Sequence, residues 1–216
     1  MGAGILPVSM HKNKLYFLFG KENKYADTPG WSDFGGGTDG SETRVETAVR
    51  EGGEELTGFL GDDRVVRDMV TKSPYVLIEN RYGSNEKNIY YMHVTPMEYD
   101  ESLPLYYNNN QRFLQKRLPV QIIKTSKIFE KAEIRWFCID DLIKKKSEFR
   151  KYFQDLLPMI LGKREEIAAL FKKGRGGIRR VRGQGQGQGH GLRSNRATRS
   201  TRLNKKKGWA TRRRRG

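Results

Sequence analysis

Three glutamates, Glu51, Glu54 and Glu55, stand close together in the sequence. Positions three and four residues apart lie on the same face of an α-helix, so their carboxylates would share one face, which we expect to be solvent-facing. Crowded carboxylates repel one another, and a divalent cation relieves that repulsion. Hard oxygen ligands of this kind suit Mg²⁺ or Mn²⁺. The spacing therefore predicts a divalent-metal site on a helix.

A glycine run, Gly35-Gly36-Gly37, lies shortly before this helix. Glycine lets the backbone approach a metal ion and phosphate groups closely. A metal ion beside such a loop neutralises phosphoryl oxygens and activates or orients water. The two features together predict hydrolysis of a phosphate ester or a pyrophosphate.

The segment from Gly36 to Gly58 resembles the Nudix box, G-x5-E-x7-R-E-U-x-E-E-x-G-U, where U is a bulky aliphatic residue. The residues at the required spacings are Gly36, Glu42, Arg50, Glu51, Glu54 and Glu55. Two positions depart from the box, because Gly52 occupies the aliphatic position and Thr57 replaces the glycine, with Gly58 one residue late. Gly52 lies on the packing face, together with Val45, Val49 and Leu56, and we expect that face to be underfilled.

The resemblance implies roles for these residues. Glu51, Glu54 and Glu55 would bind the metal, with Glu54 or Glu55 as the catalytic base, and Arg50 would orient the glutamates. The carbonyl oxygen of Gly35 or Gly36 would be a further metal ligand, and Glu42 a structural or outer-shell acid.

The resemblance extends over about residues 3–146 and adds candidates outside the box. Many family members take an additional acid from a late segment, for which Glu133 is our first candidate and Glu130 our second. Trp31, Phe34 and Tyr25, in the loop before the glycines, could stack on a nucleotide base, and packing in the core or within the loop is the alternative.

The periodicity of the chain predicts an α/β fold, and the resemblance makes it a Nudix-type α/β/α sandwich with a mixed sheet. We expect strands over residues 3–10, 15–19, 70–80, 88–95 and 134–139. We expect helices over residues 41–56 and 111–117, and one beginning at 140–146. Apolar residues at helical spacing over 149–161 indicate an amphipathic helix, which Pro158 and Gly162 should kink or split.

The charge divides the chain into two parts. The protein has 216 residues, with 42 Lys and Arg against 25 Asp and Glu and a formal net charge of +17. Residues 174–216 hold 15 of these cations and no acid, whereas the remaining 27 cations nearly balance the 25 acids. We therefore predict a Nudix domain over 1–146, an amphipathic helical extension over 147–173 and a disordered Arg/Gly-rich tail over 174–216.

Arg-Gly-rich cationic segments bind phosphate backbones with little sequence preference, so the tail predicts RNA or another nucleic acid as a partner. The alternative is a solubilising or localising tail. The candidate nucleic-acid-binding residues are Arg175, Arg179, Arg180, Arg182, Lys205, Lys206, Lys207, Arg212, Arg213, Arg214 and Arg215.

Cys138 is the single cysteine, and no signal-peptide or membrane-spanning pattern stands out. These features predict an intracellular setting, cytoplasmic or nuclear. Similar small Nudix proteins with basic tails occur in large DNA viruses, which fits a viral origin.

The resemblance implies a Mg²⁺-dependent (or Mn²⁺-dependent) pyrophosphohydrolase that cleaves a nucleoside diphosphate linked to another group. The tail favours RNA 5′ ends or caps as the substrate. Small nucleotides such as ADP-ribose, dinucleoside polyphosphates or damaged nucleotides stay open, as does a catalytically inactive RNA-binding Nudix module.

Overall fold

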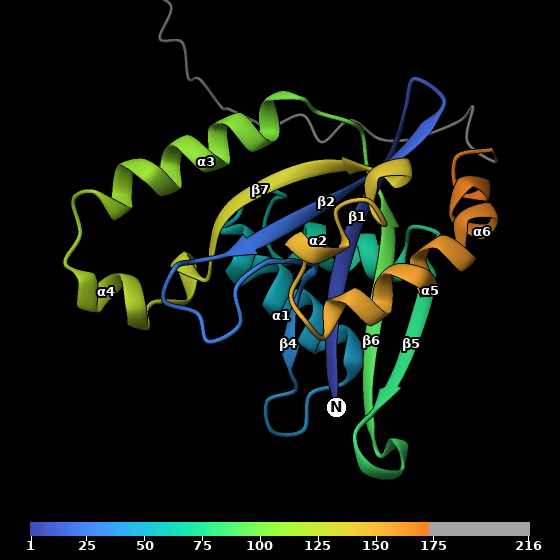
Figure 1. Cartoon of the computed structure of the whole chain (residues 1–216), viewed down its shortest axis with the longest axis horizontal. Helices are drawn as coiled ribbons and strands as arrows, with labels where there is room; N and C mark the ends of the chain where they lie inside the picture. Colours follow the sequence, from blue (N-terminus) through green and yellow to red (C-terminus); the bar gives the residue numbers. More distant parts are fainter. Residues whose placement is uncertain (173–216) are drawn as a thin grey trace, which may run out of the picture. The chain divides into compact units, whose positions relative to one another are not determined.

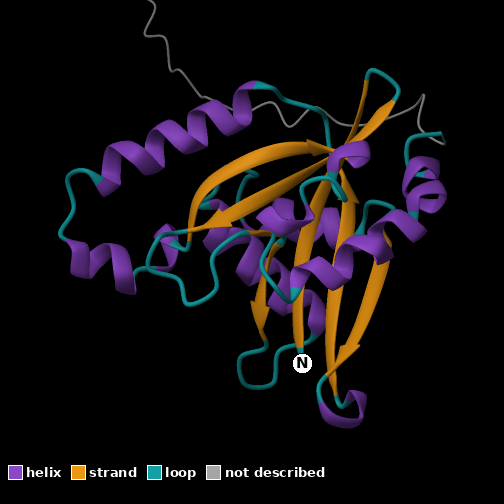
Figure 2. Cartoon of the chain, in the orientation of Figure 1, coloured by secondary structure: helices purple, strands orange, loops and turns teal. Residues whose placement is uncertain are grey.

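The computed structural model describes residues 1–172, and its centre is one mixed sheet of seven strands (Figures 1 and 2). The strands are β1 (Gly2–His11), β2 (Lys14–Glu22), β3 (Trp31–Ser32), β4 (Phe34–Gly37), β5 (Val76–Tyr82), β6 (Asn88–Pro96) and β7 (Lys131–Cys138). The principal strand order is β3-β2-β1-β6-β5, with β4 paired to β1 and β7 paired to β2.

Strand β1 holds the sheet together. It pairs antiparallel with β2 through a tight turn in which Lys12 and Asn13 adopt positive φ angles. It pairs parallel with β6, and Gly4 on β1 lies opposite Gly35 on β4. The β1–β4 pairing places the glycine run at an edge of the sheet, next to the strand that fixes it.

Helices cover both faces of this sheet. The α-helices are α1 (Arg44–Leu56), α2 (Asp63–Thr71), α3 (Ser102–Gln115), α4 (Val120–Thr125), α5 (Leu156–Gly162) and α6 (Arg164–Ala169). Short 3-10 turns occupy Ser84–Glu86, Lys127–Phe129, Ile139–Asp141, Lys146–Glu148 and Phe153–Asp155. The α/β class and the mixed sheet with helices on both faces are as predicted.

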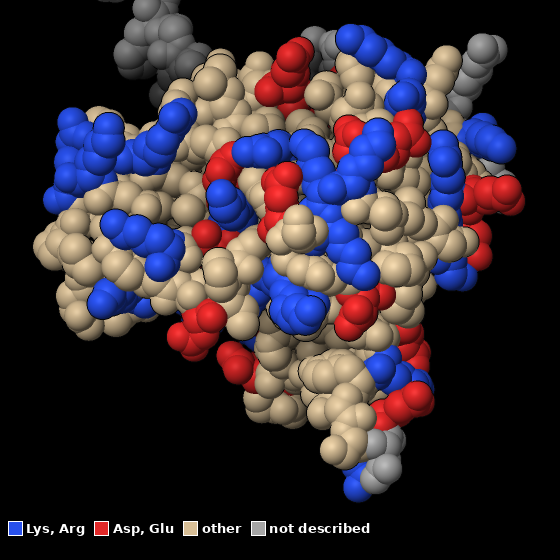
Figure 3. All heavy atoms as spheres, viewed as in Figure 1, with Lys and Arg blue, Asp and Glu red and all other residues tan. Residues whose placement is uncertain are grey.

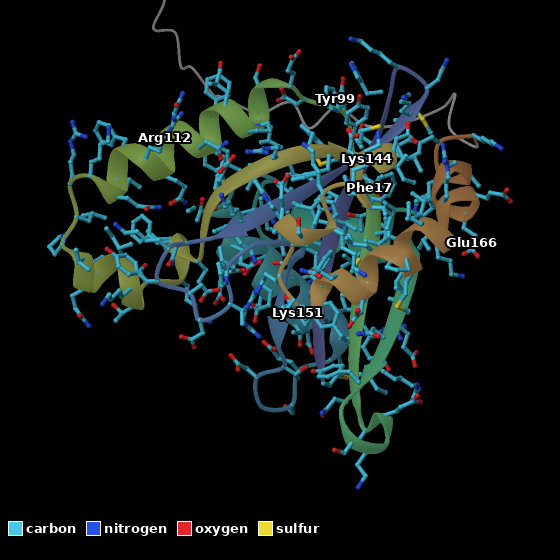
Figure 4. All side chains as sticks on the ribbon, in the orientation of Figure 1. Phe17, Tyr99, Arg112, Lys144, Lys151 and Glu166 are labelled. Carbon is cyan, nitrogen blue, oxygen red and sulfur yellow. The ribbon has the colours of Figure 1, made fainter. Side chains whose placement is uncertain are left out.

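Two hydrophobic clusters form the core, one on each face of the sheet. Helices α1 and α2 pack Val49, Leu56 and Val66 against Ile5 of β1. On the other face, Phe17 of β2, which Figure 4 labels, is buried in one cluster with Phe153 and with apolar residues of α5. Each cluster takes the alternate side chains of the strands, as a two-sided sheet requires.

Residues 149–170 contribute to that second cluster. Phe149, Phe153, Leu156, Leu157, Ile160 and Ile167 are buried in it with the strand residues. Pro158 lies in the first turn of α5, where its missing N–H leaves no backbone bond unmade. It therefore does not interrupt α5, contrary to our expectation. Gly162 is the last residue of α5, and the segment is split there, because α6 begins only at Arg164.

Several local expectations are wrong. The strand expected from Val70 begins at Val76, because residues 63–71 form α2, capped by the Asp62 side chain on the N–H groups of Arg64 and Val65. The helix expected at 111–117 is the last part of the longer α3. Residues 140–146 hold the end of one 3-10 turn, isolated turns and the start of another instead of a regular helix.

No helix among the described residues is both long and apolar enough to cross a membrane. The predicted tail and all of its candidate nucleic-acid-binding cations lie outside the described residues.

Candidate metal and phosphate site

Helix α1 carries the acids of the site and begins with a capping box. The Thr43 side chain accepts a hydrogen bond from the Glu46 N–H, and the Glu46 carboxylate accepts one from the Thr43 N–H at 2.8 Å. The expected start at Ser41 or Glu42 is therefore two to three residues too early. The helix ends at Leu56, because Thr57 adopts a left-handed conformation with φ of 49°. Thr57 thus takes the conformation that favours glycine at a helix end.

The carboxylates of Glu51 and Glu55 are buried, with exposed fractions of 5% and 3%, so the expected solvent-facing acids face inward. The Gly35 N–H donates a hydrogen bond to Glu55 Oε2 at 2.9 Å. A Cβ atom at Gly36 would lie 2.7 Å from the Glu51 carboxyl carbon, which is too close for any real contact. The missing side chain of Gly36 therefore lets the Glu51 carboxylate lie directly against the backbone, and the Gly35 N–H holds the carboxylate of Glu55.

Glu130 completes an acidic cluster with these two residues. One carboxylate oxygen each from Glu51, Glu55 and Glu130 lie within 4.8 Å of one another. Oxygen ligands at this separation, beside the backbone of Gly35 and Gly36, fit Mg²⁺ or Mn²⁺. Of the two late acids predicted from the sequence, the structure places Glu130, the second candidate, in the cluster. Glu133 instead pairs with Arg135 at 2.7 Å and is not part of the cluster.

Burial raises the pKa of Glu55 well above its ordinary value and also raises the pKa of Glu51. Desolvation causes both shifts, because it disfavours the negative charge of a buried carboxylate. A nearby cation has the opposite effect, so the cluster has the electrostatics of a site that gains from a divalent ion.

Arg50 connects the cluster to the loop before α1. Its Nη1 donates to Glu51 Oε1 at 2.8 Å, and its Nη2 donates to the Gly37 carbonyl oxygen at 2.9 Å. Its Nε and Nη2 also form a fork on Glu42, at 2.8 and 3.0 Å, and this pairing lowers the pKa of Glu42 to about 2. Glu42 does not reach the cluster but holds the arginine that positions Glu51.

Glu54 takes a different position from its two neighbours. Its side chain is 32% exposed, and Arg50 Nη1 lies 3.4 Å from its Oε2. Lys127 Nζ lies 3.8 Å from the same oxygen. Glu54 is not part of the acidic cluster, so its predicted roles as ligand and base stay predictions.

Lys131, which no motif in the sequence indicates, lies fully buried beneath the cluster. Its Nζ lies 3.1 Å from Glu55 Oε1, contacts Glu22 Oε1 and donates to Ser32 Oγ at 2.9 Å. Burial acts against its charge, but Glu55 and Glu22 raise its pKa on balance. Arg150 Nη1 reaches the same Glu22 oxygen at 2.7 Å. Lys131 stands at a polar position of a strand in which polar and apolar residues alternate, and its partners are far away in sequence. The local pattern therefore gives no sign that this lysine is buried next to the acids.

The cluster lies in a cleft of about 380 Å³. Three cations line the cleft, namely Lys124, Lys127 and Arg150, which provide positive charge where phosphate oxygens would lie. Tyr25 also lines it, with Lys124 Nζ 5.1 Å from its ring centroid. Figure 3 shows how Lys and Arg alternate with Asp and Glu over the middle of one face of the molecule.

Trp31 and Phe34 do not line the cleft. Their exposed fractions are 1% and 0%, and Trp31 packs edge-on against Phe137 at a centroid distance of 5.0 Å. The expectation that they stack on a base is wrong, because an aromatic residue near a glycine loop suits the core equally well. Tyr25 is the aromatic residue of that loop that the structure places at the cleft.

No protein-family model matches the chain. The chain is 24% identical over 209 residues to the uncharacterized protein L534 of Acanthamoeba polyphaga mimivirus; the match covers 80% of the chain and 66% of that protein. The chain thus spans about two thirds of that viral relative's length.

Among solved structures, the chain is similar to an Ap4A hydrolase of C. elegans, with 12% identity, coverage of 78% of this chain and 99% of that one, and a TM-score of 0.47. It is also similar to a bifunctional NMN adenylyltransferase/ADP ribose pyrophosphatase of Francisella tularensis, solved with AMP and a Mn ion. That match has 12% identity, covers 77% of this chain and 41% of that one, and has a TM-score of 0.48.

Proposed function

We propose that this protein is a divalent-metal-dependent pyrophosphohydrolase of the Nudix type. The observation that carries the proposal is the cluster of Glu51, Glu55 and Glu130 against the glycine run, in a cleft rimmed by cations. The chemical fit is specific, because oxygen ligands, close backbone and positive charge together suit a metal-bound pyrophosphate.

The residues of the cleft have different roles in this proposal. Glu51, Glu55 and Glu130 would hold Mg²⁺ or Mn²⁺, which neutralises phosphoryl oxygens and lowers the pKa of bound water. Arg50 fixes the Glu51 carboxylate, and Lys131 keeps a positive charge next to Glu55. Lys124, Lys127 and Arg150 bind the phosphate groups and compensate the charge that develops during cleavage.

The substrate would be a nucleoside diphosphate linked to a further group. Tyr25 offers an aromatic face at the cleft for a base. The cationic tail in the sequence favours an RNA 5′ end or cap over a small nucleotide, since a small nucleotide leaves the 15 basic residues of 174–216 without a role.

A product-resolved hydrolysis panel tests this proposal. The panel contains ADP-ribose, a dinucleoside polyphosphate, nucleoside triphosphates and 5′-capped RNA, each with Mg²⁺ and with EDTA. We expect metal-dependent cleavage of at least one pyrophosphate bond and a loss of about 10² to 10³ in kcat for Glu51→Gln. Absence of cleavage across the panel would contradict the proposal and would favour the RNA-binding module.

A further inference from the structure

The segment from Ser102 to Lys127, which contains α3 and α4 and is called the arm here, carries one sign of charge. It has five cations, and the sequence holds no Asp or Glu between Glu101 and Glu130. All five cations are exposed, namely Arg112, Lys116, Arg117, Lys124 and Lys127. In Figure 3, blue atoms and no red atoms lie at the left end of the view, where Figure 1 places α4 and the last turns of α3.

The arm also exposes aromatic rings among these cations. Tyr106 is 65% exposed and Phe113 is 54% exposed. The guanidinium carbon of Arg117 lies over the Phe113 ring, 3.7 Å from its centroid, which makes a cation–π pair at the surface. Exposed aromatic rings next to cations are the combination that binds unpaired bases and phosphates of a single strand.

The buried face of α3 fixes the arm to the site. The Tyr107 hydroxyl donates to the backbone oxygen of Glu55 at 2.7 Å and lies 3.0 Å from that of Lys131. Asn108 exchanges two hydrogen bonds with the backbone of Ile134, at 3.1 and 2.8 Å. The arm is therefore tied to the helix and the strand that carry the acidic cluster and its buried lysine.

The arm and the cleft are also continuous. Lys124 and Lys127 belong to the arm and line the cleft. Arg112, which Figure 4 labels on α3, and its neighbours Lys116 and Arg117 do not line the cleft, so the charged surface of the arm extends beyond it. A phosphate chain that begins in the cleft meets positive charge on this side.

We propose that the arm binds the single-stranded RNA that continues from phosphate groups held in the cleft. This inference rests on the proposed function for the position of the RNA 5′ end. An acidic protein would also complement the positive charge of the arm. It would not need the exposed Phe113–Arg117 pair, however, and it would not account for the continuity of the arm with the cleft. The arm thereby selects nucleotides joined to a chain over free nucleotides.

The first test removes arm charge outside the cleft. The arm triple variant is Arg112→Gln, Lys116→Gln and Arg117→Gln. The matched control is Arg64→Gln, Lys72→Gln and Lys87→Gln, which removes three exposed cations from α2, from the residue after it and from the turn before β6. Every variant is the full chain, so the contribution of the tail is common to all of them. The probe is a fluorescent, 5′-triphosphorylated single-stranded RNA of about 20 nucleotides, with binding measured by anisotropy at several salt concentrations.

We expect the arm triple variant to bind the probe about tenfold more weakly and the control triple variant to change little. The slope of log affinity against log salt should fall by about 2 for the arm triple variant, because each lost phosphate contact on a single strand removes about 0.7. Equal losses for the two triple variants would overturn the inference, since they would show that net charge alone matters. Unchanged binding by the arm triple variant would also overturn it and would leave this face to an acidic protein.

The second test isolates stacking. Phe113→Ala should weaken single-stranded RNA binding about fivefold and leave blunt duplex RNA unaffected, because bases in a duplex are not free to stack on a side chain. Tyr82→Ala, which removes another exposed ring on β5, is the control. Equal effects of Phe113→Ala on duplex and single strand would contradict the inference.

Hydrolysis separates this inference from the proposed function. If the enzyme cleaves a pyrophosphate, the arm triple variant should keep its activity on ADP-ribose or another small nucleotide, and its KM for 5′-capped RNA should rise while kcat stays the same. If the wild-type chain cleaves nothing, the proposed function fails, whereas the binding comparison still decides whether the arm holds RNA. Equal KM values for capped RNA in the arm triple variant and the wild type would overturn the inference.

Discussion

Replacing Gly36 by alanine tests the geometry of the acidic cluster with a single methyl group. The nearest heavy atoms to the added Cβ all belong to the Glu51 carboxylate, with the carboxyl carbon at 2.7 Å and Oε2 at 2.9 Å. Ordinary contacts of such atoms are longer by roughly 1 Å, so the carboxylate must move by about that distance. The end of a flexible side chain can make this movement without unfolding the site.

The expected cost is mainly catalytic. A displacement of about 1 Å at a catalytic group lowers the rate by roughly 10²-fold, so kcat/KM should fall by that factor. The melting temperature should change little, because alanine also reduces the conformational entropy of the unfolded chain. Turnover of the best substrate from the hydrolysis panel and thermal unfolding of the same samples measure the two effects.

Gly37→Ala is the matched control on the next residue. A Cβ atom there has no neighbour within 4 Å among the described residues, and the carbonyl oxygen that accepts from Arg50 is kept. We expect near wild-type activity from this variant. Full activity of Gly36→Ala, or an equal loss in Gly37→Ala, would refute the reasoning that close contact between Gly36 and Glu51 sets the site.

Three further predictions concern stability. Gly52→Ala should destabilise the fold by about 1 kcal/mol, because Ile5 Cδ1 would lie 2.7 Å from the new Cβ atom. Adding Ile5→Val removes that methyl group and should recover part of the lost stability, which a double-mutant cycle of urea unfolding measures. Thr57→Gly should raise the free energy of unfolding by up to about 1 kcal/mol, because it relieves the left-handed φ of 49°; an unchanged urea midpoint would count against that strain. Burial raises the pKa of Asp33 to about 7, so the folded state keeps a proton that the unfolded state loses above about pH 4, and stability should fall as the pH rises from 4 to 7. The fall in the free energy of unfolding that Asp33 causes amounts to at most about 4 kcal/mol, and Asp33→Asn should remove it. Urea unfolding in the presence of EDTA at pH 4.5 and at pH 7 measures the effect. If the free energy of unfolding of Asp33→Asn depends on pH as strongly as that of the wild type, the prediction is contradicted.

The sequence predicted the helix of the site well, because its evidence is local. The spacing of Glu51 and Glu55 places both in one acidic cluster, and the glycine run lies against them. The underfilled packing face at Gly52 was predicted wrongly, because Ile5, far away in sequence, fills that space.

The remaining parts of the site depend on contacts between distant segments. Lys131 and Glu22 are 109 residues apart, and no local pattern indicates that they meet in the interior. Which of the two late acids joins the cluster depends on where β7 begins. Glu130 precedes the strand and lines the cleft, whereas Glu133 lies within the strand. Helix α2 was missed because its valines also suit a strand, and only the Asp62 cap distinguishes the two.

Mn²⁺ binding to paired variants of the late acids tests most directly the claim that this cleft is a metal site. Electron paramagnetic resonance titration would compare the wild-type chain with Glu130→Gln and Glu133→Gln, which remove the same charge three residues apart. The cluster predicts weaker Mn²⁺ binding by about tenfold or more for Glu130→Gln and wild-type binding for Glu133→Gln, since only Glu130 offers an oxygen within 4.8 Å of those of Glu51 and Glu55. Wild-type affinity in Glu130→Gln, together with a loss in Glu133→Gln, would contradict the account.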